Sequence, residues 1–402
     1  MAQAEKNKIN IQAYVMIIAL LFIWIFFHFL TVRWDEVFEA QGFIAKSDAF
    51  FDSGFLQARN LSNLSRQFAV TAITAIGMVY VIIAGEIDLS IGSQLALLGG
   101  VLAMLDFGLG LPPVIVIPAV LIMGCILGLW NGFWVSYMGV PSFIVTLAGM
   151  MAFRGLSELI LQNKTIAPTS DFYSIAFSKY YFPVMGIAIV VAILSLWMLY
   201  STYARRQERQ SYGLALKPAG NDYMLTIGLI AMIWFALYIY NNYKGVPPVI
   251  VLLAVLASIF TWVGRHTKFG RYIYALGGNL EATRLSGVNV KQVKMLVFMV
   301  NGLMAGIASV TLVGRLGSAA PSAGSWQELY TIAACFIGGT SMKGGIGTVY
   351  GAITGGLVMA SLQTGMQLKD INVSWQSVII GGVLLLAVFL DVIVREGKLK
   401  LR

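Results

Sequence analysis

The chain has 402 residues, of which 58% are hydrophobic and 11% are charged, and its formal net charge is +9. A soluble domain keeps roughly a quarter of its residues charged, so this composition excludes a water-soluble globular domain and requires apolar surface in contact with lipid. The basic excess lies in the loops between apolar runs, which indicates a role in membrane orientation and argues against nucleic-acid binding.

The apolar runs are continuous and about 20 residues long, which is the length of a helix that crosses a bilayer. A β-barrel would show shorter, alternating segments. An open sheet is excluded because lipid offers no partner to its unpaired backbone groups. The sequence therefore predicts an all-α polytopic membrane protein, a single transmembrane domain over residues 1–402 with about 10–12 helices, several of them short or broken.

The expected spans are, in chain order, residues 11–31, 68–85, 91–108, 112–137, 142–162, 182–202, 222–241, 246–264, 294–314, 328–341, 345–364 and 374–394. The first is too long for the core of a signal peptide, and no small-residue cleavage site precedes Arg33, so we expect it to be retained. The short segment 328–341 must cross the membrane or re-enter it for the orientation below to hold.

The distribution of Lys and Arg predicts the orientation of these spans. With the N-terminus in the cytoplasm, alternation places 17 basic residues inside and 9 outside, with Arg154 within a span. This bias favours cytoplasmic N- and C-termini. The inside set includes Lys6, Lys8, Arg205, Arg206, Arg209, Lys217, Arg395, Lys398, Lys400 and Arg402.

Residues 32–67 and 163–181 form the two long outside segments. At the end of the first, leucines recur three residues apart and Arg59 and Arg66 lie one heptad apart. This spacing predicts an amphipathic helix that lies at the membrane interface.

Internal similarity suggests a repeated architecture. The run 139–145 is echoed by the run 245–251, and regions 77–100 and 331–356 each consist of a span, a glycine-rich polar break and a second span. Paired interruptions of this kind indicate transporter repeats with a site near the midplane. Chance similarity between apolar segments is the alternative.

A polar break at residues 85–93 places Glu86, Asp88 and Ser90 between consecutive spans. Charges at membrane depth are costly and usually line a cavity or pair with a cation. One interpretation is a hinge or gate at the cytoplasmic end of a pathway. The other is a tight turn in which Asp88 caps the next helix through backbone N–H groups, and both can hold together.

Arg154 lies well inside its apolar run. A guanidinium there needs a carboxylate or several carbonyl groups around it. It could line the pathway or fix a helix bundle, or it could extend toward the outer interface about seven residues away.

Two other features limit the chemistry of the chain. The glycine-rich run 338–347 does not fit the phosphate-binding loop pattern and no Walker motif occurs elsewhere, so we expect no ATP site; the glycines would instead permit a sharp turn between half-spans. The cysteines and histidines are dispersed, so no metal site is expected. They are Cys125, Cys335, His28 and His266.

The largest expected cytoplasmic loop covers residues 265–294. Asn279 is placed to cap a short helix over 280–286, and Gly287 to end it in the left-handed conformation. A rigid exposed helix between two spans is either a lever on which another protein pushes or part of an ordinary solvated loop. The residues alone leave both interpretations open.

This loop resembles the ATPase-docking coupling helix of the branched-chain/monosaccharide family of ATP-binding cassette permeases. The residues that carry the resemblance are Phe269, Gly270, Arg271, Gly278, Asn279, Glu281, Ala282, Arg284, Ser286, Gly287, Val288 and Asn289. The polar break is similar to the family's Gly-small-Ile-Asp-Leu-Ser-x-Gly-Ser signature, with Glu86 where a small residue is common. The similarity spans residues 56–394, includes the runs 141–155, 322–324 and 338–347, and is strongest to the xylose permease subunits of bacterial sugar importers.

The resemblance implies a permease of type II-like importer architecture in the bacterial inner membrane, forming a homodimer with the pathway on its two-fold axis. Each copy would dock a cytoplasmic ATPase subunit that holds ATP and Mg²⁺, leaving this chain without a cofactor. A periplasmic sugar-binding protein would deliver a monosaccharide, xylose or a related sugar. The residues expected at the pathway or its gate are Glu86, Asp88, Ser90, Asn131, Thr146, Arg154, Asn301, Thr340 and Gln363.

Two other classes of membrane protein are alternatives to a permease. An ion-coupled secondary transporter of a small polar solute would also show broken helices and intramembrane charge, but its activity would not depend on ATP. A membrane enzyme would need a catalytic constellation, and nothing in the chain resembles a nucleophile–base pair.

Glycines four apart at 124/128, 302/306 and 351/355 predict close contacts between helices that could slide between two packings.

Overall fold

The structure is a computed structural model that describes residues 11–40, 42, 46, 50, 54–213 and 219–395. Its elements are α1 (Ile11–Thr31), α2 (Trp34–Glu39), α4 (Ala58–Ile83), α5 (Ile91–Ala103), the π-helical turn η1 (Met104–Gly108), α6 (Pro113–Ser136), α7 (Ser142–Leu161), α8 (Phe172–Ser174), the π-helical turn η2 (Ile175–Lys179), α9 (Val184–Ser211), α10 (Ala219–Asn241), α11 (Pro248–His266), α12 (Lys268–Gly278), α13 (Leu280–Leu285), α14 (Val290–Leu316), α15 (Gln327–Ile337), α16 (Val349–Leu368) and α17 (Val373–Arg395). Several residues on which the orientation was predicted lie outside the described ranges: Lys6, Lys8, Lys217, Lys398, Lys400 and Arg402.

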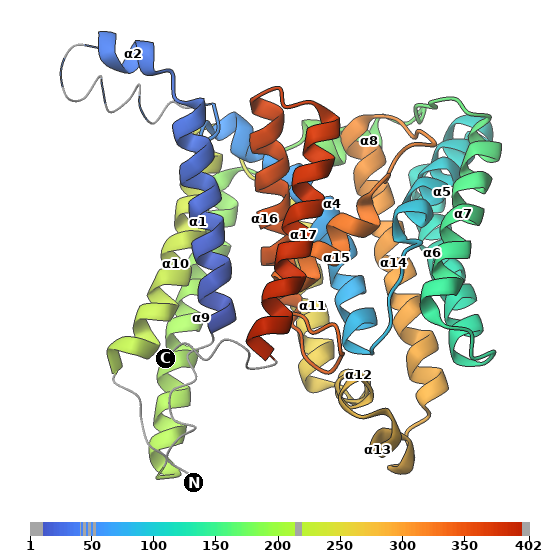
Figure 1. Cartoon of the computed structure of the whole chain (residues 1–402). Coiled ribbons are helices and arrows are strands. Elements are labelled where there is room, and N and C mark those ends of the chain that lie inside the picture. Colours follow the sequence, from blue (N-terminus) through green and yellow to red (C-terminus); the bar gives the residue numbers. More distant parts are fainter. Residues whose placement is uncertain are drawn as a thin grey trace.

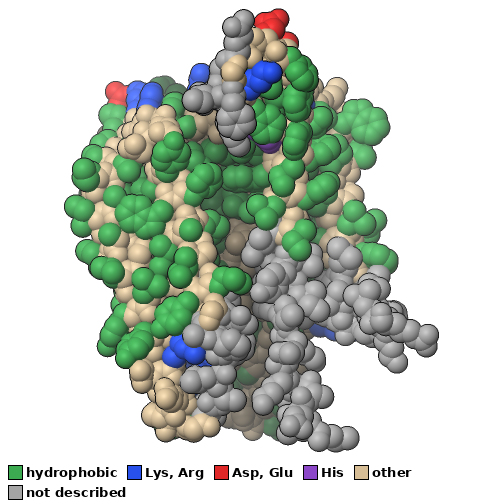
Figure 2. All heavy atoms as spheres, turned by 90° about the vertical axis from the view of Figure 1, so that its left-hand side faces the viewer, with side chains coloured by type: hydrophobic (Ala, Val, Ile, Leu, Met, Phe, Trp, Pro, Cys, Tyr) green, Lys and Arg blue, Asp and Glu red, His purple; other side chains and the backbone are tan. Residues whose placement is uncertain are grey.

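Within the described ranges, eight helical segments are long and apolar enough to cross a membrane, namely α4, α5 with η1, α6, α7, α9, most of α10, α11 and α14. Two shorter apolar helices, Ile18–Thr31 and Val373–Phe389, add to them. The all-helical membrane class is therefore confirmed. Figure 2 shows one face of the bundle, where hydrophobic side chains cover the middle and the visible charged side chains gather near the two ends.

The helix α4 begins ten residues before the span expected at residue 68, and this corrects one prediction. Residues 58–67 are not a separate interfacial helix but the first turns of α4, where Leu61, Leu64 and Arg66 are buried. The leucine spacing was correctly recognised as helical. Its apolar face continues into the span because α4 is the central helix of the bundle and packs against α11, α14, α15 and α16.

The pairs α6–α14 and α15–α16 pack backbone to backbone. A methyl group on Gly124 would overlap the carbonyl oxygen of Gly302, and one on Gly355 would overlap that of Ala334. The close contacts predicted from the glycine pairs are confirmed, and two of those pairs, 124/128 and 302/306, lie in the two helices that face each other.

Two helices begin inside the bundle and not at one of its ends (Figure 1). After α4 the chain turns back as the irregular segment 84–90 before α5 begins, and after α14 it turns back as the irregular segment 317–326 before α15 begins. Because α4 and α14 run in opposite directions, these two breaks are related as an inverted pair. The sequence comparison had instead matched the first break to region 331–356.

The bundle has two chemically distinct ends (Figure 1). The α2 end carries α2 and the loop 163–183, and the α12–α13 end carries α12, α13 and the glycine-rich loop 338–348. The predicted echo between the runs 139–145 and 245–251 has a structural counterpart, since Gly139 and Gly245 both adopt positive φ and the prolines at 141 and 247 both precede a helix.

Candidate translocation pathway and coupling junction

Asp88 lies at the centre of a fully buried polar cluster in the first break. Its Oδ1 accepts hydrogen bonds from the backbone N–H and the hydroxyl of Ser90, at 2.8 and 2.6 Å, and its Oδ2 accepts one from Asn301 Nδ2 at 2.9 Å. Both Asp88 and Asn301 are 0% exposed. Buried carboxylates persist only with such donors. The predicted cap differs in detail, because Asp88 accepts from the N–H of Ser90, the residue before α5, and no side chain caps the first turn of α5 itself.

Ser90 extends this cluster to two further helices. Its hydroxyl accepts from Asn131 Nδ2 on α6 and from Gln94 Nε2 on α5, each at 2.8 Å. The neighbouring turn of the break is held by α7, because Ser142 accepts from the Ile87 N–H at 3.3 Å. The start of α5 is thus fixed to α6, α7 and α14 at one point.

Besides Ser90, four of the expected pathway residues surround this point, and they face the protein interior in this conformation. Asp88, Asn131 and Asn301 are joined through the cluster, and Thr146 donates to the backbone of its own helix at Ser142, at 2.8 Å. All four are 0% exposed. They brace the broken helix and do not lie on an open surface.

Thr340 and Gln363, the remaining amide and hydroxyl candidates, lie apart from the cluster. Thr340 follows α15 and is 0% exposed, in contact with Gly347. Gln363 on α16 accepts a hydrogen bond from Gln67 on α4 at 2.7 Å. The structure therefore distributes the expected pathway residues over several levels of the bundle.

Arg154 holds the second break. Its Nη1 donates to the carbonyl oxygens of Pro321 and Ala323, at 2.5 and 2.9 Å. The side chain is partly buried and bonded to protein, so it does not extend to the outer interface. Of the interpretations left open by the sequence, the structural role is observed: the guanidinium fixes an irregular segment against α7.

The two breaks touch each other at the first turns of α5 and α15. Gly92 packs against the carbonyl oxygen of Gly324 and against the carboxylate of Glu328. Glu328 is 8% exposed, and its Oε2 has no hydrogen-bond partner in the described part of the chain. Sequence reasoning missed Glu328, although a carboxylate that opens a short apolar helix is a detectable signal.

The predicted short helix in the largest loop is confirmed as α13. Asn279 Oδ1 accepts from the Ala282 N–H at 2.9 Å, and Gly287 follows the helix with φ of +83°. Ser286 closes its last turn by donating to the Thr283 carbonyl at 2.7 Å. The face formed by Glu281, Arg284 and Leu285 is exposed, with Leu285 86% exposed.

The preceding helix, α12, was not predicted. Thr267 caps it by accepting a hydrogen bond from the Gly270 N–H at 3.2 Å, and two apolar residues of the helix itself, Ile273 and Leu276, are buried. A threonine followed by apolar residues three to four apart is a helix signal, so α12 was in principle predictable from the sequence.

A junction of three segments lies beneath α12. Gly277 packs against the carbonyl oxygen of Ile83 at the end of α4, and the same oxygen accepts from the Gly345 N–H at 2.8 Å. Tyr274 donates to the Gly347 carbonyl at 2.8 Å. Burial raises the pKa of Tyr274 and Arg265 opposes that shift, so the phenol remains a donor.

Glu86 forms an ion pair with Lys294 next to this junction. Their side chains are 13% and 19% exposed, so the pair is largely removed from solvent. The first break is thereby tied to the first turns of α14. This partner was not anticipated, because 208 residues separate the two in sequence.

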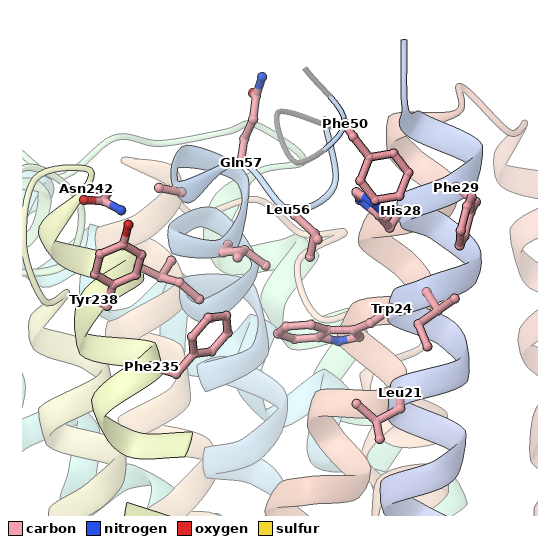
Figure 3. Close-up of a pocket in the computed structure, with 14 residues that line it drawn as sticks. Leu21, Trp24, His28, Phe29, Phe50, Leu56, Gln57, Phe235, Tyr238 and Asn242 are labelled. Carbon is pink, nitrogen blue, oxygen red and sulfur yellow. The ribbon is translucent and has the colours of Figure 1, made fainter. Parts of the chain in front are cut away.

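A cavity of about 850 Å³ opens at the α2 end between α1, α4 and α10 (Figure 3). Trp24, Leu56 and Phe235 point into it, and Gln57 and Asn242 lie at its outer rim. Its lining is mostly apolar, which suits acyl chains better than a sugar. Neither the two breaks nor the junction contributes a residue to the lining of this cavity.

Comparison with known proteins supports an import function. The profile of the family described as "Branched-chain amino acid transport system / permease component" matches residues 60–388. The chain is 45% identical over 386 residues to the xylose transport system permease protein of Escherichia coli (strain K12), covering 96% of this chain and 93% of that protein. It is 41% identical over 387 residues to the protein of the same name from Haemophilus influenzae, covering 96% and 98%.

A more distant relative is the ribose import permease protein of Haemophilus influenzae, which is 33% identical over 337 residues, covering 84% of this chain and 86% of that protein. No solved structure matches the chain.

Proposed function

Because this chain belongs to the branched-chain amino acid transport system permease family, we propose that it is the transmembrane permease subunit of an ATP-binding cassette importer that carries xylose. The observation that carries the substrate is the identity of 45% over 96% of the chain to a xylose permease. The ribose permease is less similar, at 33% over 84%. ATP hydrolysis belongs to a partner subunit.

The exposed α12–α13 end is the docking surface for that ATPase, which holds ATP and Mg²⁺. Gly278, Asn279, Glu281, Ala282, Arg284, Ser286 and Gly287 form the short helix and its caps. Leu285 leaves a large apolar side chain exposed beside two charges, a combination typical of a surface that another protein covers. This end faces the cytoplasm, together with both termini.

The opposite end receives the sugar from a periplasmic binding protein, and two copies of the chain enclose the pathway as a homodimer in the bacterial inner membrane. A neutral sugar needs a polar and transiently hydrated path and no fixed charge. The two breaks supply polar backbone and side chains at membrane depth, where a regular helix would present only apolar groups.

The junction suggests how ATP hydrolysis moves the pathway. Closure of the ATPases displaces α12–α13, and Gly277 transmits that displacement to the end of α4 and to the loop at Gly345, because the three backbones are in contact. Glu86 and Lys294 carry it on to the first break and α14. The hydrogen-bonded cluster around Asp88 then moves together with the first break. Glu86 and Asp88 therefore belong to the gate of the pathway.

Reconstitution in vesicles tests this function. The permease, an ATPase subunit and a xylose-binding protein are combined with ATP on the ATPase side, and uptake of labelled xylose, ribose and glucose is compared. We expect ATP-dependent uptake that prefers xylose and survives a protonophore. Uptake without ATPase that collapses with the protonophore would indicate a secondary transporter and refute the proposal.

A further inference from the structure

We propose that the segment from Ser322 to Trp326 lines the sugar pathway and that Trp326 forms an aromatic subsite for the apolar face of the sugar ring. This inference deepens the proposed function and rests on it for the identity of the sugar. It assigns the pathway surface to the second break, in place of the buried amides and hydroxyls around Asp88.

The segment lies at membrane depth. Gln327, the next residue, donates to the hydroxyl of Thr71 at 3.1 Å, and Thr71 is at the midpoint of α4. Arg154, which binds the carbonyls of the segment, lies about 10 Å from the Leu161 end of α7 and about 18 Å from its other end, at 1.5 Å per residue. The segment therefore descends from the α2 end to the middle of the bundle.

Irregular backbone at this depth is incompatible with a surface that faces lipid. Non-helical segments are tolerated inside a membrane only where they are buried in protein or line a water-filled cavity. Ser322, Ser325 and Trp326 are nevertheless exposed on this chain, with Trp326 62% exposed. Within the proposed homodimer this surface faces either the second copy of the chain or water, and a pathway enclosed by the two copies supplies that water.

Trp326 is held in a costly conformation. Its φ is +65°, in the left-handed region that bulky residues avoid, and it forms the N-cap position of α15 without a side-chain hydrogen bond. Glycine would relieve this strain, and an exposed indole gains little from burial in return. Such strain indicates a role for the side chain itself. An indole offers the C–H face of a pyranose a flat apolar surface, while its N–H remains available to a hydroxyl group.

The groups behind Trp326 complete a sugar subsite. Glu328, the second residue of α15, is buried two positions after Trp326, and its Oε2 lacks a hydrogen-bond partner in the described part of the chain. A water or sugar hydroxyl that enters between the two breaks can donate to it. Arg154 holds the backbone of the segment through the carbonyl groups of Pro321 and Ala323, so the subsite keeps its shape.

Cysteine accessibility tests the pathway assignment on the complete importer. The background variant carries Cys125→Ala and Cys335→Ala, and Ser325→Cys is compared with Ile193→Cys. Ile193 is 62% exposed and lies on the peripheral helix α9, about 13 Å from its Val184 end. A membrane-impermeant, positively charged methanethiosulfonate reagent is added, because only thiols in contact with water form the reactive thiolate.

We expect Ser325→Cys to be labelled at least about tenfold faster than Ile193→Cys, and labelling at position 325 to abolish xylose uptake. Equal labelling of the two, or full labelling at 325 without loss of uptake, overturns the pathway assignment. If the unlabelled importer does not take up xylose at all, the proposed function fails, whereas the labelling rates still decide whether the segment faces water.

Three substitutions test the indole. Trp326→Phe should retain most xylose uptake, and Trp326→Ala should lower it by about two- to tenfold, the range expected for one aromatic contact. Trp326→Gly should raise the midpoint of thermal unfolding while lowering uptake, which a purely structural residue would not do. ATP hydrolysis stimulated by the binding protein reports assembly in each case. Wild-type uptake by Trp326→Ala, or destabilisation by Trp326→Gly, overturns the aromatic subsite.

Discussion

Gly277 of α12 and Ile83 at the end of α4 are in direct backbone contact, with no room for a methyl group between them. The carbonyl oxygen of Ile83 also accepts the Gly345 N–H at 2.8 Å, so it is shared by the two segments that pack on it. A displacement of α12 therefore cannot be absorbed by side chains at this point. It must move the backbone of α4 and of the loop before α16.

Replacement of Gly277 by alanine should disrupt this contact. The added methyl group overlaps both the Ile83 carbonyl and the Gly345 amide, and overpacking of this kind costs about 1–3 kcal/mol. We expect a lower midpoint of thermal unfolding in detergent and slower ATP-driven uptake.

The adjacent Gly278 provides a matched control, since a methyl group there meets nothing within 4 Å. Gly278→Ala should unfold at the midpoint of the unsubstituted protein. Equal destabilisation by both substitutions would mean that the overlap with Ile83 is not the cause, because alanine at the end of α12 otherwise favours the helix.

Reversal of the ion pair between Glu86 and Lys294 should distinguish a specific contact from two independent charges. Glu86→Lys and Lys294→Glu should each destabilise the protein, because each leaves two like charges in a largely solvent-excluded site. The double reversal should recover about 0.5–3 kcal/mol of coupling free energy. A double-mutant cycle on thermal unfolding measures it, and additive effects of the two reversals would contradict the pair.

Exchange of Asp88 and Asn301 should reverse one hydrogen bond and keep the others. Asn301→Asp alone places a second carboxylate 2.9 Å from that of Asp88 and should cost about 3–5 kcal/mol. In the double exchange, Asp88→Asn retains an oxygen for Ser90 and donates its amide to the new carboxylate at 301. We therefore expect partial recovery of expression and thermal stability, and a double variant no better than Asn301→Asp would exclude this hydrogen-bond pattern.

The sequence allowed prediction of the elements better than of their contacts. Apolar runs of bilayer length located most helices to within a few residues, because lipid imposes the same length on each of them. The cap at Asn279 and the turn at Gly287 were predictable because both are local, involving residues only a few positions apart. The start of α4 was wrong because the pattern does not reveal whether a helical face is covered by lipid or by protein.

The contacts that define the site are long-range, and no periodicity reports them. Glu86 and Lys294 are 208 residues apart, and the guanidinium of Arg154 binds carbonyl groups 167 and 169 residues further along the chain. A backbone carbonyl has no signature in the sequence at all. Trp326 was overlooked for a related reason, since its left-handed conformation follows from the packing of the two breaks.

The exposed face of α13 gives the last prediction. Combined replacement by Glu281→Ala and Arg284→Ala should weaken ATPase docking by about tenfold or more, because charged anchors beside an exposed apolar side chain contribute strongly to binding. Xylose uptake should fall accordingly while the permease still inserts and the ATPase still hydrolyses ATP. The combined replacement by Glu208→Ala and Arg209→Ala removes the same charges from exposed positions near the end of α9 and should leave uptake unchanged. Uptake at the unsubstituted rate after loss of Glu281 and Arg284 would mean that the ATPase is coupled through another surface.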